Sequence, residues 1–132
     1  MSTSKPIIED AVTIVPVRNV EASVRFYTDI LGFEPRFVSD DKNFATVVHG
    51  EAALHLLHSD DQASLNATAN HISVYLWVRG VDALYAAYKP KLDALDEGRV
   101  RAPFDQPYGM REFHVKDPDG CLLFFGENIS PD

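Results

Sequence analysis

The chain has 132 residues, a formal net charge of −8 at pH 7, and hydrophobic residues at 45% of its positions. That length is enough for one domain with a core, and the apolar content excludes a disordered chain. The acidic balance disfavours nucleic acid and anionic membranes as partners and would attract cationic small molecules.

The sequence shows no segment typical of secretion or membrane insertion. Its first residues, MSTSKPIIED, contain no long apolar core, and no window approaches the roughly 18 uninterrupted apolar residues of a membrane helix. The single cysteine, Cys121, excludes an internal disulfide, fits a reducing compartment and has no motif around it that would indicate a nucleophile. We therefore expect a cytoplasmic protein.

The first half of the chain predicts a strand, a helix and three short strands. An apolar run, VTIVPV (12–17), precedes VRNVEASVRFY (17–27), in which Asn19 stands at a helix cap position. The helix should end at Gly32. Its predicted inward face comprises Val20, Val24, Tyr27 and Leu31. The β-like runs that follow are PRFVS (35–39), FATVVHG (44–50) and AALHLLH (52–58).

The second half repeats this plan. VRGVDALYAAY (78–88) matches the first helical segment and follows another apolar run, ISVYLWV (72–78). Pro90 should end or kink this helix. Its predicted inward residues are Val81, Leu84, Tyr85 and Tyr88. The predicted strands are GRVRAPF (98–104), MREFHV (110–115) and CLLFFGE (121–127), the last two joined by the turn DPDG.

A polar, turn-rich linker, SDDQASLNATAN (59–70), joins the two halves. We expect a single domain over 1–132, with one module at 11–58 and the other at 71–127. The fold class is then α+β, and the two halves can curl their sheets around a shared cleft.

This doubled plan resembles the vicinal oxygen chelate superfamily, which includes glyoxalases, extradiol dioxygenases and bleomycin resistance proteins. VRNVEASVRFYTDILGFEPRF is similar to the family's first helix and strand, and DPDGCLLFF to its closing hairpin. The resemblance covers about residues 11–127 and implies two βαβββ modules whose curled mixed sheets surround a cleft. DDKNFATVVHGEAALHLL, WVRGVDALYAAY and QPYGMREFHVKDPDG look like bleomycin resistance proteins, which bind and sequester the drug.

The resemblance also indicates where a metal would bind. Metal-dependent members take ligands from the first and last strands of each half, which correspond here to Val12, His55, Ser73 and Phe124. Of these, His55 alone is a good donor for a divalent ion. A two-residue shift in register would pair His55 with His71 on one sheet face, with Glu112 or His114 as the remaining source of a third donor. We predict no metal site and no cofactor.

We expect the ligand site to be lined by aromatic side chains, because flat heteroaromatic groups stack on rings and nearby acids attract cations. By resemblance, Phe44 and Tyr108 match the phenylalanine and tryptophan that hold the drug's planar bithiazole, in crevices at a dimer interface. Phe37 matches a further aromatic residue, and Arg111 could pair with Glu112 or with a ligand. The predicted ligand-binding set is Phe37, Phe44, His55, Trp77, Tyr108, Arg111 and Phe113.

Three features depart from the family pattern. Tyr108 offers a smaller stacking face than tryptophan, two residues are inserted ahead of Phe44, and Thr13 replaces a proline of the strand that the family exchanges between protomers. The remaining phenylalanines, expected to be core residues, are Phe26, Phe33, Phe104 and Phe125.

Three functions fit these observations. The first is a homodimeric protein that binds and sequesters a cationic, partly aromatic natural product, as in bleomycin resistance. The second is an enzyme of the same fold, a lyase, isomerase or dioxygenase that uses a divalent metal. The third is a binder of an unknown small molecule with no role in resistance.

Overall fold

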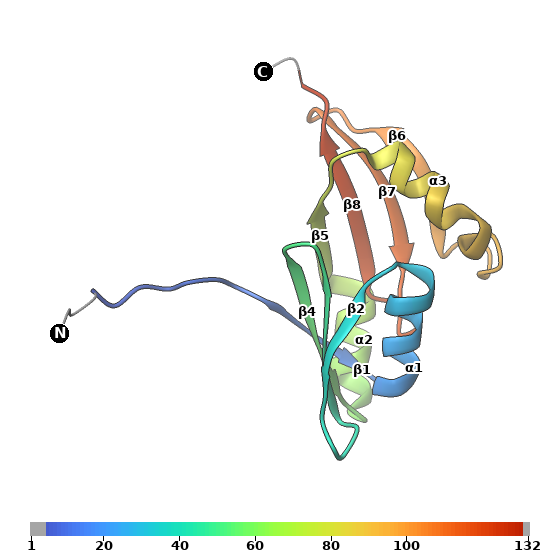
Figure 1. The fold of residues 1–132 in the computed structure, drawn as a ribbon. Helices are drawn as coiled ribbons and strands as arrows, with labels where there is room; N and C mark the ends of the chain where they lie inside the picture. The colour runs from blue at the N-terminus through green and yellow to red at the C-terminus, as the bar shows by residue number, and fades with distance from the viewer. Residues whose placement is uncertain (1–4, 131–132) are drawn as a thin grey trace.

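The two halves of the chain form two four-stranded mixed sheets with the same strand order (Figure 1). In the computed structural model, which describes residues 5–130, the orders are β1-β4-β3-β2 and β5-β8-β7-β6. β1 pairs with β4 in parallel, and β5 pairs with β8 in parallel. The other strand pairs are antiparallel. The predicted α+β class and the repeat are confirmed, and the sheets do not close into a barrel.

The helices and strands fall close to their predicted positions. The first half contains β1 (Thr13–Val17), α1 (Val20–Arg25), its π-helical continuation η1 (Phe26–Ile30), β2 (Glu34–Val38), β3 (Phe44–His49) and β4 (Ala52–His58). The second half contains β5 (Ser73–Trp77), α3 (Val81–Leu92), β6 (Val100–Asp105), β7 (Met110–Lys116) and β8 (Leu122–Asn128). Between them lies α2 (Gln62–His71).

Two details of these helices differ from the sequence-based expectation. The polar linker contains α2, which begins where the Asp61 side chain accepts a hydrogen bond from the Ser64 backbone N–H. Pro90 does not end α3, which continues to Leu92. A proline removes one backbone hydrogen-bond donor from a helix. The helix nevertheless continues past Pro90 to Leu92, whose side chain is buried in the core.

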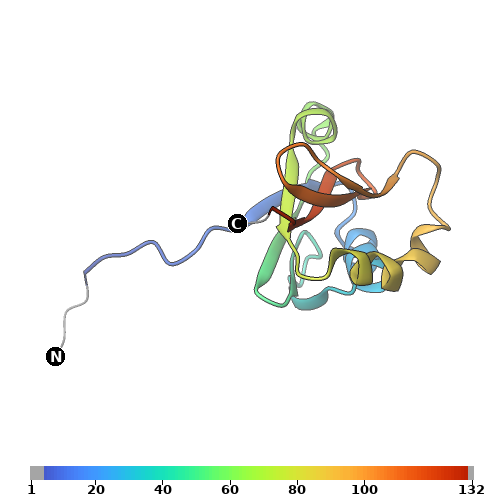
Figure 2. The same ribbon diagram turned by 90° about the horizontal axis from the view of Figure 1, so that it is seen from above.

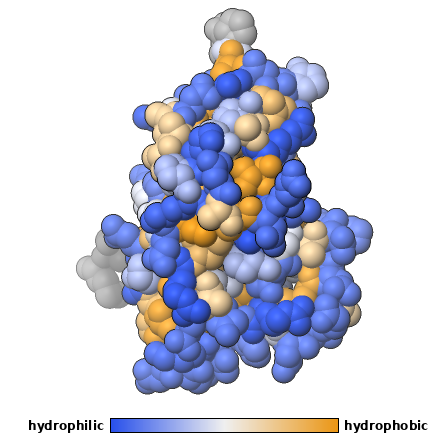
Figure 3. Space-filling view, turned by 90° about the vertical axis from the view of Figure 1, so that its right-hand side faces the viewer, coloured by the Kyte–Doolittle hydropathy of each residue, from blue (hydrophilic) through white to orange (hydrophobic). Residues whose placement is uncertain are grey.

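The helices α1 and α3 lie on the same side of the molecule and share one core with both sheets (Figures 1 and 2). Tyr88 on α3 donates a hydrogen bond to the Leu31 carbonyl oxygen at 2.5 Å, which ties the two halves together. Glu127 on β8 accepts hydrogen bonds from the backbone N–H groups of Gly80 and Val81 and so caps α3. Viewed from this side, the surface is largely hydrophilic, with apolar residues exposed between the halves (Figure 3).

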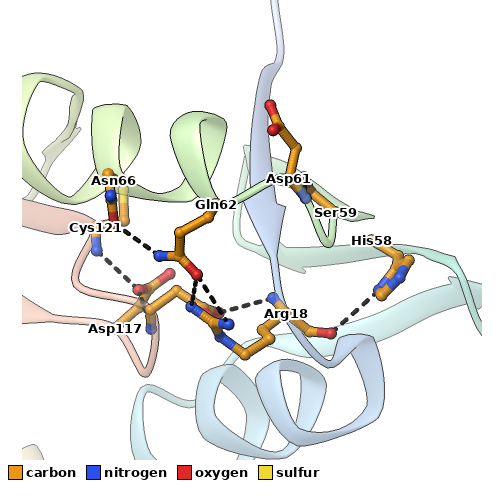
Figure 4. Close-up of polar contacts among 9 residues, drawn as sticks. Arg18, His58, Ser59, Asp61, Gln62, Asn66, Asp117 and Cys121 are labelled. Atoms are coloured by element: carbon orange, nitrogen blue, oxygen red, sulfur yellow. Dashed lines mark hydrogen bonds and ion pairs between the residues drawn. The ribbon is translucent and has the colours of Figure 1, made fainter.

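The DPDG turn between β7 and β8 docks onto the first half of the chain. Buried Asp117 accepts a hydrogen bond from the Tyr27 hydroxyl at 3.0 Å and another from the Cys121 backbone N–H at 2.9 Å. The Arg18 backbone N–H donates to Asp119, and the Arg18 side chain reaches Gln62 on α2 (Figure 4). The turn therefore fixes the relative position of the halves.

Residues 5–12 have no regular secondary structure and extend away from the body of the molecule (Figure 2). No helix in the described part of the chain is long and apolar enough to span a membrane.

Candidate functional site

Each sheet has one face covered by α1 or α3, and we call the opposite face its outer face; α2 packs against β1. Strand alternation sends successive side chains to opposite faces. On β8, Leu123 and Phe125 are buried in the core, whereas Phe124 lies on the outer face. The outer faces carry most of the exposed aromatic residues and are therefore the candidate binding surfaces.

An aromatic band crosses the outer face of the second sheet. Tyr75 on β5 stacks on Phe124 on β8, with ring centroids 5.6 Å apart, and Phe124 lies 4.1 Å from the His114 ring on β7. His114 packs edge-on against Phe104 on β6 at 5.2 Å. Trp77, which is 75% exposed, extends the band at 5.3 Å from Tyr75. These five residues, the aromatic band, offer a π surface that spans all four strands.

A cation from the chain itself already sits on this band. The guanidinium carbon of Arg101 lies 3.5 Å from the Phe104 ring centroid, an arrangement typical of a cation–π contact. Phe104 was expected to be a core residue, but it lies half-buried on the outer face because the register of β6 against β7 shifts between Arg101 and Phe104. The Phe104 end of the band is therefore covered by the Arg101 guanidinium.

Beneath the band lies a buried carboxylate, Glu112 on β7, whose side chain is 0% exposed. Its Oε2 atom accepts hydrogen bonds from the hydroxyl groups of Tyr75 and Tyr108, both at 2.7 Å. Its Oε1 atom accepts from Gln106 Nε2 at 3.0 Å and pairs with His114 Nε2 at 2.9 Å. Both carboxylate oxygens are therefore fully engaged by side chains of the outer face.

These contacts set the charge of the cluster. Burial raises the pKa of the Glu112 carboxyl, but the hydrogen bonds that it accepts outweigh burial and lower the pKa to about 2. Burial and the adjacent carboxylate raise the pKa of Tyr75, and the hydrogen bond to Glu112 raises the pKa of Tyr108. At neutral pH the site therefore holds an ionised carboxylate and two protonated phenols.

Gly126 makes the contact between Tyr75 and Glu112 possible. Gly126 lies opposite Glu112 in the pairing of β7 with β8, and opposite Trp77 in the pairing of β5 with β8. A Cβ atom at this position would overlap the Tyr75 hydroxyl. The missing side chain thus lets Tyr75 reach across β8 to the carboxylate on β7.

The first sheet carries a second, smaller aromatic group on its outer face. The Phe37 and Phe44 rings lie 6.2 Å apart, and Phe44 packs edge-on against His55 at 5.1 Å. Phe37 is 53% exposed, and Phe44 and His55 are half-buried. The structure thus brings three of the predicted site residues together on one surface.

Trp77 and Tyr108, two further predicted residues, lie on or beside the outer face of the second sheet. Arg111 and Phe113 do not, because they alternate with Glu112 on β7 and point to the helix side. Arg111 forms ion pairs with Asp82 and Asp105, both at 2.9 Å. Phe113 is fully buried and stacks on Phe125 at 4.5 Å. Arg111 and Phe113 therefore lie outside the candidate site.

The sequence indicates Glu112 only as a possible third metal donor or as a partner of Arg111, whereas the structure places it at the centre of this cluster. Glu112 does not pair with Arg111, because neighbouring residues in a strand face opposite ways and Arg111 pairs with Asp82 and Asp105. The alternation of side chains in the predicted strand does indicate that Glu112 lies on the face opposite to that of Arg111 and Phe113. The reach of Tyr75 across Gly126 has no signal in a single sequence.

The positions that correspond to metal ligands in the superfamily carry Val12, His55, Ser73 and Phe124 here. His71 belongs to the last turn of α2 rather than to a strand, so the prediction that it shares a sheet face with Ser73 is wrong. Within residues 5–130, no group of three or more His, Cys, Asp or Glu side chains is arranged to hold a metal ion. Cys121 is buried, and burial with the nearby Asp117 raises its pKa to about 12.

A groove of about 870 Å³ lies between the two halves. Its lining combines the turn between β3 and β4 with the end of β5, and Trp77 is the one predicted site residue that borders it. The groove therefore does not join the aromatic group of the first sheet to the aromatic band of the second.

The sequence profile of the glyoxalase/bleomycin resistance protein/dioxygenase superfamily matches residues 10–125, and the chain belongs to this family. Among curated proteins, it is 29% identical to the bleomycin resistance protein of Geobacillus stearothermophilus, over 90% of this chain and 96% of that protein. A bleomycin resistance protein of Staphylococcus aureus matches with the same identity and coverage.

Solved structures agree with this assignment. The bleomycin-binding protein of Streptomyces verticillus, in complex with copper(II)-bleomycin, is 30% identical, with a TM-score of 0.75 over 92% of this chain and 97% of that one. The bleomycin resistance determinant of transposon Tn5 has the same fold, with 22% identity and a TM-score of 0.75 over 92% of this chain and 98% of that one.

Proposed function

We propose that this protein binds and sequesters a bleomycin-type antibiotic, a cationic and partly aromatic natural product, without a metal of its own and without transforming it. The observation that carries the proposal is the aromatic band over a buried carboxylate. Flat heteroaromatic groups can stack on the rings, and the ionised Glu112 favours a cation above them. The identity to bleomycin resistance and bleomycin-binding proteins supports the same ligand class.

The proposal includes a homodimer in which the outer face of the first sheet of one copy meets that of the second sheet of the other. Two facts support it. The aromatic residues of one chain are divided between two surfaces, and both surfaces expose large apolar side chains. The exposed residues are Ile14, Phe37 and Leu57 on the first sheet, and Trp77 and Tyr108 on or beside the second. We propose that the dimer acts in the cytoplasm.

A titration of the purified protein with metal-free bleomycin tests the function. Trp77 is the single tryptophan and lies in the aromatic band, so its fluorescence should report occupancy. We expect saturable quenching at one ligand per chain, with the drug recovered unchanged. Failure to bind bleomycin would overturn the proposal, and about one tightly bound Zn, Ni, Mn or Fe per chain would favour a metal-dependent enzyme instead.

A further inference from the structure

The two tyrosine hydroxyl groups of the site are fixed in one hydrogen-bonding role. A phenol has a single proton to donate and lone pairs with which to accept. Tyr75 and Tyr108 both place this oxygen 2.7 Å from Glu112 Oε2, and an ionised carboxylate can only accept. Each phenol therefore gives its proton to Glu112 and keeps only acceptor capacity for a ligand.

The remaining contacts hold this arrangement in place. Gln106 and His114 occupy the other carboxylate oxygen, so Glu112 cannot rotate without losing hydrogen bonds. Among the described residues, Glu112 pairs with His114 and with no Lys or Arg nitrogen within 4.0 Å. The negative charge beneath the phenols thus lacks a permanent cationic partner, and donation to an anion makes each phenol oxygen a stronger acceptor.

We propose that Glu112 determines ligand specificity: by holding both tyrosine hydroxyls as acceptors, it makes this face select cations that carry N–H donors. Ammonium, amidinium and guanidinium groups satisfy both the charge and the acceptors. Carboxylates and phosphates are repelled, and fully alkylated cations keep the charge but leave the phenol oxygens without donors. This inference rests on the proposed function and specifies the ligand chemistry of the same site.

Three probes with one ring system separate charge from hydrogen bonding. They are 2-naphthylmethylammonium, its N-trimethylated counterpart and 2-naphthoate. Binding is measured by the shift of the Trp77 indole N–H resonance in nuclear magnetic resonance spectra. In the parent protein we expect the ammonium probe to bind about tenfold more tightly than the trimethylated probe, as a hydrogen bond to a charged donor contributes, and we expect naphthoate to bind most weakly.

Glu112→Gln tests the role of the carboxylate. The amide nitrogen would donate to the phenols, which frees their protons to point outward. The ratio of ammonium to trimethylated affinity should then fall to near one, and naphthoate binding should rise. Glu127→Gln on β8 is the control, since it removes the same charge on the helix side and should preserve the parent ratio.

A second variant guards against loss of folding in Glu112→Gln. Tyr108→Phe keeps an exposed ring over the carboxylate and removes one acceptor, so it should lower the same ratio several-fold while the protein stays folded. Equal binding of the two cations to the parent, no binding of the ammonium probe at millimolar concentration, or an unchanged ratio in a folded variant would overturn the inference. Bleomycin is titrated in parallel, and its binding is judged separately, so the proposed function can survive that result.

Discussion

At the scale of single residues, Tyr108 carries the clearest consequence for binding. Tyr108 is 59% exposed beside the aromatic band, and its hydroxyl donates a hydrogen bond to Glu112. Tyr108→Ala should weaken bleomycin binding several-fold to about tenfold, because one stacking ring contributes on the order of 1 kcal/mol. The fluorescence titration measures this loss, and the melting temperature should stay within a few degrees of the parent value. A variant that binds bleomycin as well as the parent does would contradict the assignment of Tyr108 to the site.

Asp117 predicts a dependence of stability on pH. Burial raises its pKa from 3.8 to about 6, although hydrogen bonds from Cys121, Tyr27 and Asp119 act in the opposite direction. The folded state therefore holds the proton more tightly than the unfolded state. The resulting stabilisation is complete below about pH 4 and is lost as the pH rises through about 6, a loss of roughly 3 kcal/mol at most.

Asp117→Asn removes this titration and keeps an oxygen that can accept from the turn. The free energy of unfolding of the variant minus that of the parent should therefore rise by roughly 2 to 3 kcal/mol from pH 4 to pH 7. Urea unfolding at both pH values measures this change. A difference between the two proteins that does not vary with pH would show that Asp117 has an ordinary pKa.

At this scale, a structure that depends on neighbouring residues can be predicted from the sequence, whereas one that depends on the pairing of distant strands cannot. Asn19 caps α1 through a hydrogen bond from the Ala22 backbone N–H, as its residue type predicted. Phe44 lies half-buried on the outer face of the first sheet and Tyr108 lies exposed beside that of the second, so their assignment to the ligand site stays a prediction. Phe104, expected in the core, lies on the outer face because the register of β6 against β7 shifts. Phe113, expected in the ligand site, is buried because side chains alternate along β7.

At the scale of elements, the contact between β5 and β7 across β8 depends on Gly126. Gly126→Ala should destabilise the protein by about 1 to 3 kcal/mol, because the new methyl group overlaps Tyr75 and must displace it from Glu112. Urea unfolding measures the loss. In a Tyr75→Ala background the same methyl group should cost much less, which a double-mutant cycle would detect. Equal losses in the two backgrounds would mean that Tyr75 is not the constraint at Gly126.

The helices show which elements a sequence can predict. α1 and α3 were predicted because each has a cap, an acid in its first turn and an apolar face. α2 has only Leu65 and Thr68 buried, so its apolar pattern is too sparse to separate it from a polar linker. It is supported by its Asp61 cap and by contacts with neighbouring elements that become visible only in the fold.

At the scale of the whole molecule, the repeat predicted two similar halves, whereas the strand order within each sheet and the arrangement of the outer faces are seen only in the structure. α1 and α3 pack into one shared core. The groove between the halves does not join the two outer faces of one chain. We therefore propose that a site made from both aromatic groups includes a second copy of the chain. We expect sedimentation at micromolar concentration to give about twice the 14.7 kDa chain mass.

A mixing experiment distinguishes a shared site from a site within one chain. Phe44→Ala removes a ring from the first sheet and Tyr108→Ala removes one beside the second, so each variant alone should bind bleomycin weakly. If each site combines the first sheet of one copy with the second sheet of its partner, a mixed dimer contains one intact site and one site that lacks both rings. After unfolding and refolding together in equal amounts, about one quarter of all sites should regain parent affinity.

A stoichiometric titration followed by Trp77 fluorescence would resolve this fraction, and refolding each variant separately is the control. No recovery in a mixture shown by sedimentation to be dimeric would mean that each chain builds its own site, and a clean monomer at micromolar concentration would exclude the shared site altogether.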